Sequence, residues 1–200
     1  MFEEFPKIPR LFRDCTITEK IDGTNAQVAI YHSKDPDKPT QNPLAVWCVG
    51  EGEMILYMFA GSRKRWIAIG DDNFGFANWV QENSADLFDL GPGRHYGEWW
   101  GQGIQRKYGL DHKRFSLINT KRWGDERPEC CHVVPIIYEG PFYMDAVTEA
   151  AHTLEVEGSM AAPGFMQPEG VIIFHHHANL CFKYTPFDGN GHKHEHDRKK

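Results

Sequence analysis

The chain has 200 residues, of which 40% are hydrophobic and 13% aromatic, and it carries a formal net charge of −6. This composition predicts a folded globular protein with a packed core. The negative charge excludes a general electrostatic attraction to nucleic acid or anionic lipid, although it is compatible with local basic clusters.

No apolar run approaches the roughly 20 residues of a membrane-spanning helix. The N-terminal sequence MFEEFPKIPR has neither the basic lead nor the apolar stretch of a secretory signal. We therefore expect a cytoplasmic protein with no membrane contact. The five cysteines show no CxxC spacing, which favours reduced thiols that mostly pack in the interior over disulfides or a zinc site.

Alternating polar and apolar residues between turn signals predict a series of short strands. They are expected at residues 15–21, 25–32, 44–49, 55–60, 94–100, 114–119, 132–138, 170–175 and 179–185. Two helices are predicted, one at 78–90 that ends at Gly91-Pro92-Gly93, and one at 146–157 with Asp145 as N-cap. The pattern is typical of an α+β protein with mainly antiparallel sheet.

Residues 1–187 show no domain linker and are treated as one unit. Residues 188–200 contain no apolar side chain, so a polar, disordered tail is expected there. The run His175-His176-His177 is interpreted as a polar hairpin turn, because three consecutive side chains of a strand cannot all face one metal ion. The later histidines His192, His194 and His196 fall in the predicted tail.

The stretch Lys20-Ile21-Asp22-Gly23-Thr24-Asn25 places a charged cluster at the head of a strand. Its glycine permits a tight turn and the close approach of a ligand. A lysine in this position is a candidate nucleophile. Since a free lysine with a pKa near 10.4 is neutral in only about one molecule in a thousand at pH 7, burial, neighbouring cations or a metal are required. The alternative is a solvated surface lysine.

Four further segments follow this KxDGxN motif in a defined order. They are His95–Gly101, Arg114–Asn119, Pro168–Ile173 and Leu180–Tyr184. KxDGxN resembles the nucleotide-attachment motif of the covalent nucleotidyltransferases, which include ATP-dependent DNA ligases, RNA ligases and mRNA capping enzymes. The four segments are similar to the YGE motif, the aromatic strand motif, the EGVV motif and the final lysine motif of that superfamily. Asn25, Gly61–Trp66 and the PEGVI form favour the RNA ligase branch.

The resemblance implies a nucleotidyltransferase (ATP-grasp-like) fold in which antiparallel sheets enclose a nucleotide pocket between flanking helices. It implies an ATP-dependent RNA ligase that forms a lysyl-AMP intermediate and joins RNA 5′-phosphate and 3′-hydroxyl ends, with ATP and Mg²⁺ or Mn²⁺ as cofactors. The alternatives are a DNA ligase, a capping-type guanylyltransferase, or a lapsed member that binds nucleotide or RNA without ligation.

The resemblance also implies roles for individual residues. Lys20 would form the AMP adduct, Asp22 would belong to the same catalytic motif, and Lys183 would contact the α-phosphate while helping to keep Lys20 neutral. Glu98 would bind the ribose, unless it is only a charge at a sheet edge. Glu169 would position the divalent metal, unless it simply begins a strand.

Further nucleotide contacts are expected from other positions. Asn25 would hold the water shell of the metal, and Arg63 would reach the nucleotide or an RNA phosphate. Main-chain groups of Thr18 and Glu19 would read the adenine edge. Phe115 would stack on the adenine, although it is equally a candidate core residue, with Leu117 or Ile118 lining the pocket instead.

Basic pairs interleaved with aromatic residues are candidates for gripping RNA, with solvated charge as the alternative. The pairs are Arg106-Lys107, Lys113-Arg114 and Lys121-Arg122, and the aromatic residues are Trp99, Trp100, Tyr108 and Trp123.

Two features depart from the family pattern. The final motif usually presents two lysines separated by one residue, whereas Cys181-Phe182-Lys183 has one. We also expect no further C-terminal domain after Thr185. We therefore expect an accessory protein to take the place of that domain, or self-adenylylation to dominate over ligation.

Overall fold

The computed structural model describes residues 2–5, 7–50 and 54–187. Contacts divide the chain into two compact units, the first formed by residues 1–21 with 135–200 and the second by residues 22–134. The crossing from the first unit to the second lies between Ile21 and Asp22, inside the KxDGxN motif. No change of composition marks that point, and for this reason the sequence showed no boundary.

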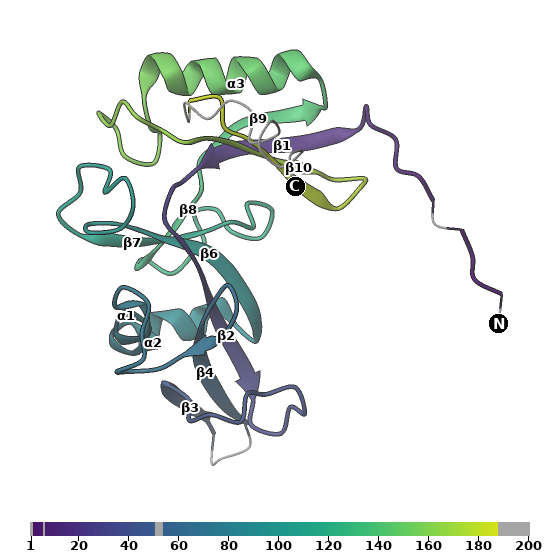
Figure 1. The fold of residues 1–200 in the computed structure, drawn as a ribbon. Coiled ribbons are helices and arrows are strands. Elements are labelled where there is room, and N and C mark those ends of the chain that lie inside the picture. The colour runs from purple at the N-terminus through teal and green to yellow at the C-terminus, as the bar shows by residue number, and fades with distance from the viewer. Residues whose placement is uncertain (1, 6, 51–53, 188–200) are drawn as a thin grey trace, which may run out of the picture. The chain divides into compact units, whose positions relative to one another are not determined.

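The first unit is a four-stranded antiparallel sheet with one helix (Figure 1). The strands lie in the order β11-β10-β1-β9, in which strands distant in sequence are neighbours. The elements are β1 (Asp14–Lys20), β9 (Ile136–Pro141), α3 (Met144–Glu157), β10 (Gly170–His175) and β11 (Leu180–Tyr184).

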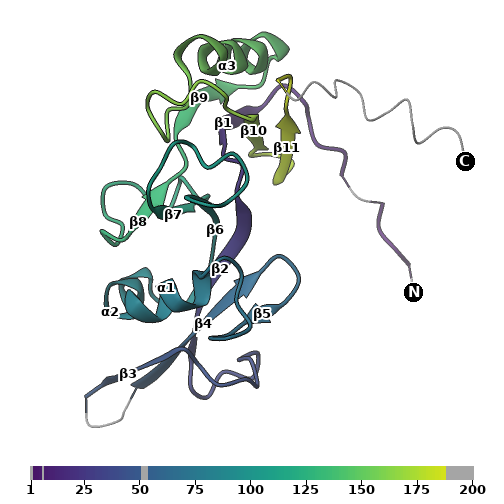
Figure 2. The same cartoon turned by 60° about the vertical axis from the view of Figure 1, so that its left-hand side comes forward.

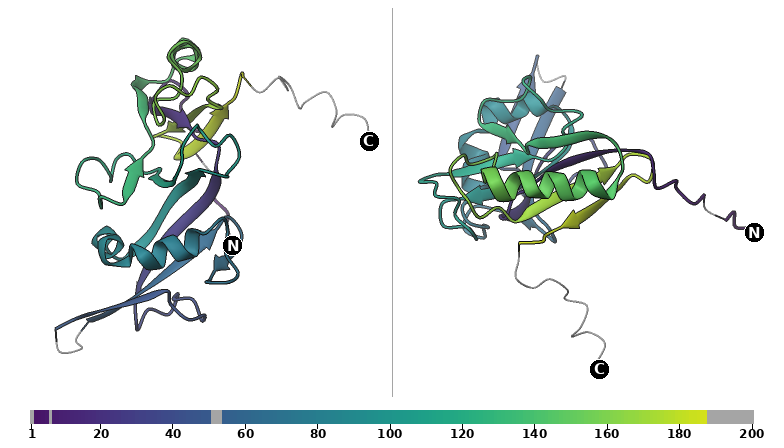
Figure 3. Two further views of the ribbon diagram at one scale, coloured as in Figure 1. Left: turned by 90° about the vertical axis from the view of Figure 1, so that its left-hand side faces the viewer. Right: turned by 90° about the horizontal axis from the view of Figure 1, so that it is seen from above.

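Helix α3 packs its apolar stripe on one face of this sheet (Figure 3). Val147, Ala150 and Leu154 recur at helical spacing and contact the cluster that contains Ile17 and Ile173. The predicted stripe is therefore confirmed. The predicted N-cap is wrong: the N-cap residue is Tyr143, which makes no side-chain capping bond, and Asp145 lies in the first turn. A carboxylate there still favours the helix through the macrodipole.

The second unit is a seven-stranded sheet with helices on one face (Figure 2). The order is β3-β4-β2-β6-β7-β8, with β5 paired to β4, and all pairs are antiparallel except β7–β8. The strands are β2 (Thr24–His32), β3 (Ala45–Val49), β4 (Met54–Ser62), β5 (Trp66–Ile67), β6 (Gly93–Gly101), β7 (Lys113–Leu117) and β8 (Cys131–Val133).

The predicted helix at 78–90 is three short helices, α1 (Phe76–Glu82), α2 (Ser84–Leu87) and η1 (Phe88–Leu90). The break occurs at Asn83, whose side-chain amide donates to the Trp79 carbonyl at 2.8 Å. Asparagine competes with the backbone for such bonds and so favours helix ends. The predicted stop is confirmed, since η1 ends at Leu90 and the C-cap residue Gly91 has a φ of 73°.

One predicted strand is wrong: residues 132–138 form β8 in the second unit and β9 in the first. Pro135 stands between them, and proline cannot donate a ladder hydrogen bond. The hairpin interpretation of the histidine run is confirmed for His176 and His177, which lie in the turn between β10 and β11. It is wrong for His175, which is the last residue of β10 and is buried. Among the described helices none is long and apolar enough to cross a membrane. The predicted tail, with its three histidines, lies outside the described residues.

Candidate active site

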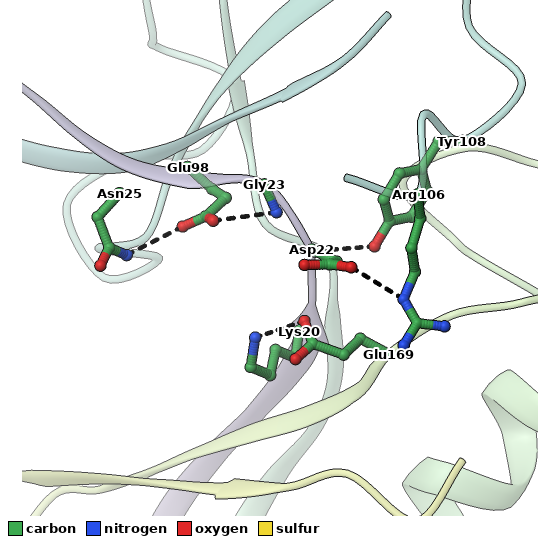
Figure 4. A network of polar contacts seen from close by, with 8 residues as sticks. All are labelled: Lys20, Asp22, Gly23, Asn25, Glu98, Arg106, Tyr108 and Glu169. Atoms are coloured by element: carbon green, nitrogen blue, oxygen red, sulfur yellow. Dashed lines mark hydrogen bonds and ion pairs between the residues drawn. The ribbon is translucent and has the colours of Figure 1, made fainter. Parts of the chain in front are cut away.

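Lys20 is the last residue of β1, where the strand pairs with the start of β10. Its register partner is Gly170, and the Nζ atom lies 2.5 Å from Oε2 of Glu169, the residue before β10 (Figure 4). The two side chains are 21% and 12% exposed. Two predicted site residues separated by 149 positions in sequence therefore form one partly buried ion pair.

Lys183 lies on the same face of this sheet as Lys20. It pairs with Ile172 across β10–β11, and Ile172 pairs with Thr18 across β1–β10. Directly opposed residues of antiparallel strands share a face, and side chains two positions apart along a strand do so as well. Lys183 is exposed. The register that the sequence left open thus places Thr18, Lys20 and Lys183 on the face opposite α3.

Glu19 points to the other face, and the residue is 1% exposed. It accepts hydrogen bonds from the Ser159 hydroxyl at 2.6 Å and from the Ala161 amide at 2.9 Å. Burial raises the pKa of Glu19, against the lowering effect of these donors. The main-chain amide of Glu19 donates to the Pro135 carbonyl at 3.0 Å. This amide is therefore not available for a hydrogen bond to the adenine. A reading of adenine by this residue would rest on its carbonyl group alone.

In the second unit, Glu98 of β6 organises the other half of the KxDGxN motif. Its carboxylate accepts from the Gly23 amide and from the Asn25 side-chain amide, each at 3.1 Å (Figure 4). The second bond leaves the amide oxygen of Asn25 as an acceptor, and Asn25 is exposed. Glu98 is thus more than a charge at a sheet edge, because it binds the chain beside the candidate nucleophile.

Gly23 is required by packing rather than by a turn. An added Cβ would lie 2.5 Å from the Trp99 carbonyl oxygen and 2.7 Å from Cβ of Trp100. The residue is not among those with positive φ. The sequence interpretation named the close approach of a ligand, whereas in the structure the neighbour that approaches is strand β6.

Asp22 is held by two residues that the sequence analysis assigned to an RNA grip. The Asp22 amide donates to the Tyr108 hydroxyl at 2.7 Å, and Arg106 Nε lies 3.0 Å from Asp22 Oδ2 (Figure 4). No periodicity or motif signal connects positions 84 and 86 residues apart in this way.

Phe115 is fully buried, with ring centroids 5.1 Å from Phe76 and 5.6 Å from Trp79. The structure therefore favours the alternative of a core residue over adenine stacking. Alternation along β7 places Ser116, the register partner of Glu98, on the opposite face. Ile118 continues that face and is 51% exposed.

Ile118 also lines a small pocket of about 60 Å³ in the second unit. The other lining residues are Arg94, His95, Tyr96, Asn119, Arg122 and Trp123. Burial lowers the pKa of His95, whose Nε2 lies 2.9 Å from the Gly91 carbonyl oxygen. Arg63 lies elsewhere in this unit, exposed in the turn after β4.

The aromatic residues of the predicted RNA grip are not open for base stacking. Trp99, Trp100, Tyr108 and Trp123 are at most 8% exposed. Arg106 is engaged with Asp22, whereas Lys107, Lys121 and Arg122 remain exposed. Only the basic part of the prediction is therefore compatible with the described surface.

The cysteines form no disulfide among the described residues, and all five are free. Cys15 and Cys131 are buried, as the sequence predicted for most of them, whereas Cys48 and Cys181 are exposed. No group of three or more His, Cys, Asp or Glu side chains that could hold a metal occurs in the described part of the chain. A cation could therefore take only part of its ligand shell from these side chains.

Comparison with known proteins gives a consistent result. The family model described as RNA ligase matches residues 13–185. No curated protein matches the sequence. Solved structures of an RNA ligase from Naegleria gruberi are similar in fold, and the chain spans about half the length of each.

Three of these structures illustrate the extent of the similarity. A lysine-to-alanine mutant without ligand matches with a TM-score of 0.54 at 15% identity, over 86% of this chain and 49% of that one. A second lysine-to-alanine mutant, with ATP and Mn, gives 0.53 at 14% identity over 86% and 50%. A glutamate-to-alanine mutant with AMP and Mn gives 0.58 at 15% identity over 88% and 50%.

Proposed function

The chain belongs to the RNA ligase family, and we propose from this premise that it is an ATP-dependent RNA ligase whose nucleophile is Lys20. The observation that carries the proposal is the ion pair of Lys20 and Glu169 on a sheet face that also presents Lys183. Residues 1–187 would make up the adenylyltransferase domain. That the sheets adopt an ATP-grasp-like arrangement enclosing a nucleotide is part of the same proposal.

In the first step the Lys20 amine attacks the α-phosphorus of ATP, a P–N bond forms and pyrophosphate leaves. The amine must give up a proton before it attacks. The contact with Glu169 engages the Nζ atom, so it has to be exchanged when substrate binds. Lys183, two strands away on the same face, would supply positive charge for the phosphoryl oxygens.

In the second step the RNA 5′-phosphate attacks the adenylyl phosphorus and Lys20 leaves as the amine. In the third step the RNA 3′-hydroxyl attacks the 5′-phosphorus, the phosphodiester bond forms and AMP leaves. Exposed basic residues of the second unit, such as Arg63 and Lys107, are available to bind the RNA phosphates.

The oxygen donors present fit a hard divalent cation such as Mg²⁺ or Mn²⁺. The Glu169 side chain is 12% exposed and is paired with Lys20, and Asn25 is an exposed residue whose side-chain nitrogen binds Glu98. Glu169 would bind the ion directly and Asn25 through water. When bound, the ion supplies positive charge for the phosphates and competes with Lys20 for Glu169.

Further contacts with the nucleotide are part of the same proposal. Glu98 would bind the ribose hydroxyls from the position in which it already accepts the Gly23 amide. Ile118, rather than the buried Phe115, would supply the apolar contact for the adenine. Thr18, which shares the face of Lys20, would contribute main-chain contacts to the adenine edge.

The test is covalent labelling with ATP that carries the label in the α-phosphate, followed by a denaturing gel. Label is expected on the wild-type protein, absent in Lys20→Ala and unchanged in Lys34→Ala, which removes an exposed lysine outside the site. Replacing ATP with GTP tests the capping alternative, and comparing nicked RNA with nicked DNA tests the DNA ligase alternative. An unlabelled wild-type protein across metals and pH would overturn the proposal.

A further inference from the structure

The loop between β6 and β7 carries unusual backbone geometry. Gln105, Lys107 and Tyr108 have φ values of 42°, 60° and 51°, a region that non-glycine residues rarely adopt and that costs about 1–3 kcal/mol per residue. Such strain persists only where surrounding contacts enforce it, and it is enriched at functional sites.

Two side chains of this strained loop converge on one residue. The Tyr108 hydroxyl accepts from the Asp22 amide at 2.7 Å, and Arg106 Nε binds the Asp22 carboxylate at 3.0 Å (Figure 4). The backbone and the side chain of Asp22 are thereby held separately. Asp22 follows Lys20 by two positions in the chain, so fixing it restricts the segment that carries the nucleophile.

The loop residues are themselves held from behind. Tyr108 is 2% exposed, and its ring packs edge-on against Trp100 with a centroid distance of 4.8 Å. Trp100 in turn donates its indole N–H to the Ser116 hydroxyl at 2.9 Å. The Gln102 amide donates to the His112 carbonyl at 2.9 Å and closes the base of the loop. The Tyr108 hydroxyl therefore has little freedom to leave Asp22.

We infer that Arg106 and Tyr108 are positioning residues for the adenylylation step and act through Asp22. This inference rests on the proposed function, because it assigns the two residues to the first step of the same reaction. The ion pair of Arg106 with Asp22 is partly exposed, with side-chain exposures of 26% and 27%. We therefore expect it to contribute little to folding stability and to act by orienting Asp22.

The first experiment measures the rate of Lys20-AMP formation in a single turnover at saturating ATP. Tyr108→Phe is expected to lower the rate about 5- to 10-fold, and Arg106→Gln about 10- to 100-fold, the usual effects of losing a neutral and a charge-assisted hydrogen bond. The ATP concentration at half-maximal rate should change by less than about twofold, because neither residue is assigned to the nucleotide. Gln102→Ala, an exposed side chain of the same loop, is the matched control.

A double-mutant cycle separates positioning from a general structural effect. If Arg106 acts through the carboxylate of Asp22, Arg106→Gln should cost less than about twofold in an Asp22→Asn background. An equal cost in both backgrounds would overturn the assignment of Arg106.

Hydrogen exchange tests the Tyr108 contact without any catalysis. In Tyr108→Phe, the peptide that contains the Asp22 amide should exchange faster, while peptides from the helices of the second unit keep their protection. Unchanged exchange would overturn the assignment of Tyr108. If the wild-type protein formed no adduct, the proposed function would fail, and this measurement would still decide whether the loop holds Asp22.

Discussion

Replacing Gly23 with alanine should impair both the second unit and the adenylylation step. The added Cβ would lie 2.5 Å from the Trp99 carbonyl oxygen and 2.7 Å from Cβ of the buried Trp100. Both neighbours belong to strand β6 and cannot rotate away. Restoring an ordinary contact near 3.4 Å requires a shift of about 0.9 Å, the difference between 3.4 and 2.5 Å.

The magnitude has two parts. Overpacking against a rigid neighbour costs about 1–3 kcal/mol, and loss of the bond from the Gly23 amide to Glu98 costs about 1 kcal/mol more. The expected destabilisation is thus about 2–4 kcal/mol. Displacement of the neighbouring Asp22 by nearly 1 Å should also lower the rate of Lys20-AMP formation by about 100-fold.

Urea unfolding and the single-turnover labelling assay measure these two effects. Gly124→Ala is the control, because an added Cβ there meets no atom within 4 Å and the residue is not among those with positive φ. If Gly23→Ala matched Gly124→Ala in both stability and rate, the close approach of the motif to β6 would be refuted.

Three other changes test separate parts of the structure. Glu169→Gln should lower adduct formation about 100-fold or more, because it removes the carboxylate proposed to bind the divalent metal. Little loss of stability is expected, because the removed charge is partly exposed. A labelling rate equal to that of Glu157→Gln on α3 would contradict this role. Burial lowers the pKa of His95, so on acidification the unfolded state binds a proton before the folded state does. The free energy of unfolding should therefore fall as the pH drops from about 7.5 to about 5.5. Urea melts of His95→Gln should lack this part of the pH dependence, and an unaltered pH dependence would exclude His95 as its source. Cys181→Lys restores the paired-lysine pattern on the face of Lys183 and should raise the labelling rate several-fold, whereas no gain over Cys48→Lys would argue against a phosphate contact at that position.

Much of the secondary structure followed from local patterns. The strands at 25–32 and 170–175 were predicted within a residue or two, because alternation with period two is a local property of a half-buried strand. The helix at 146–157 followed from an apolar stripe that α3 does bury. Predictions were wrong at Asn83 and at Pro135, where short elements meet. At Asn83 a side-chain hydrogen bond to the backbone interrupts the helix, and at Pro135 the missing backbone N–H interrupts the strand. Both effects outweigh the periodicity of the surrounding residues.

Burial of individual side chains was harder to predict. Phe115 and Trp100 have the chemistry of base-stacking residues, yet both are at most 1% exposed. Whether an aromatic residue faces the core or a ligand depends on which face of its strand is covered. In the second unit the helices cover the face of Phe115. On the other face Trp100 is covered by Tyr108, whereas Ile118 is 51% exposed.

The order of the motifs and the chemical groups at each, from Lys20 through Glu98 to Lys183, could be predicted from the chain because they depend on residue types and spacing. The partners of these groups could not be predicted in this way. Contacts such as Lys20 with Glu169 or Glu19 with Ser159 join residues 149 and 140 positions apart. They depend on strand register and sheet order, which arise from packing of the whole unit and leave no local pattern in the chain.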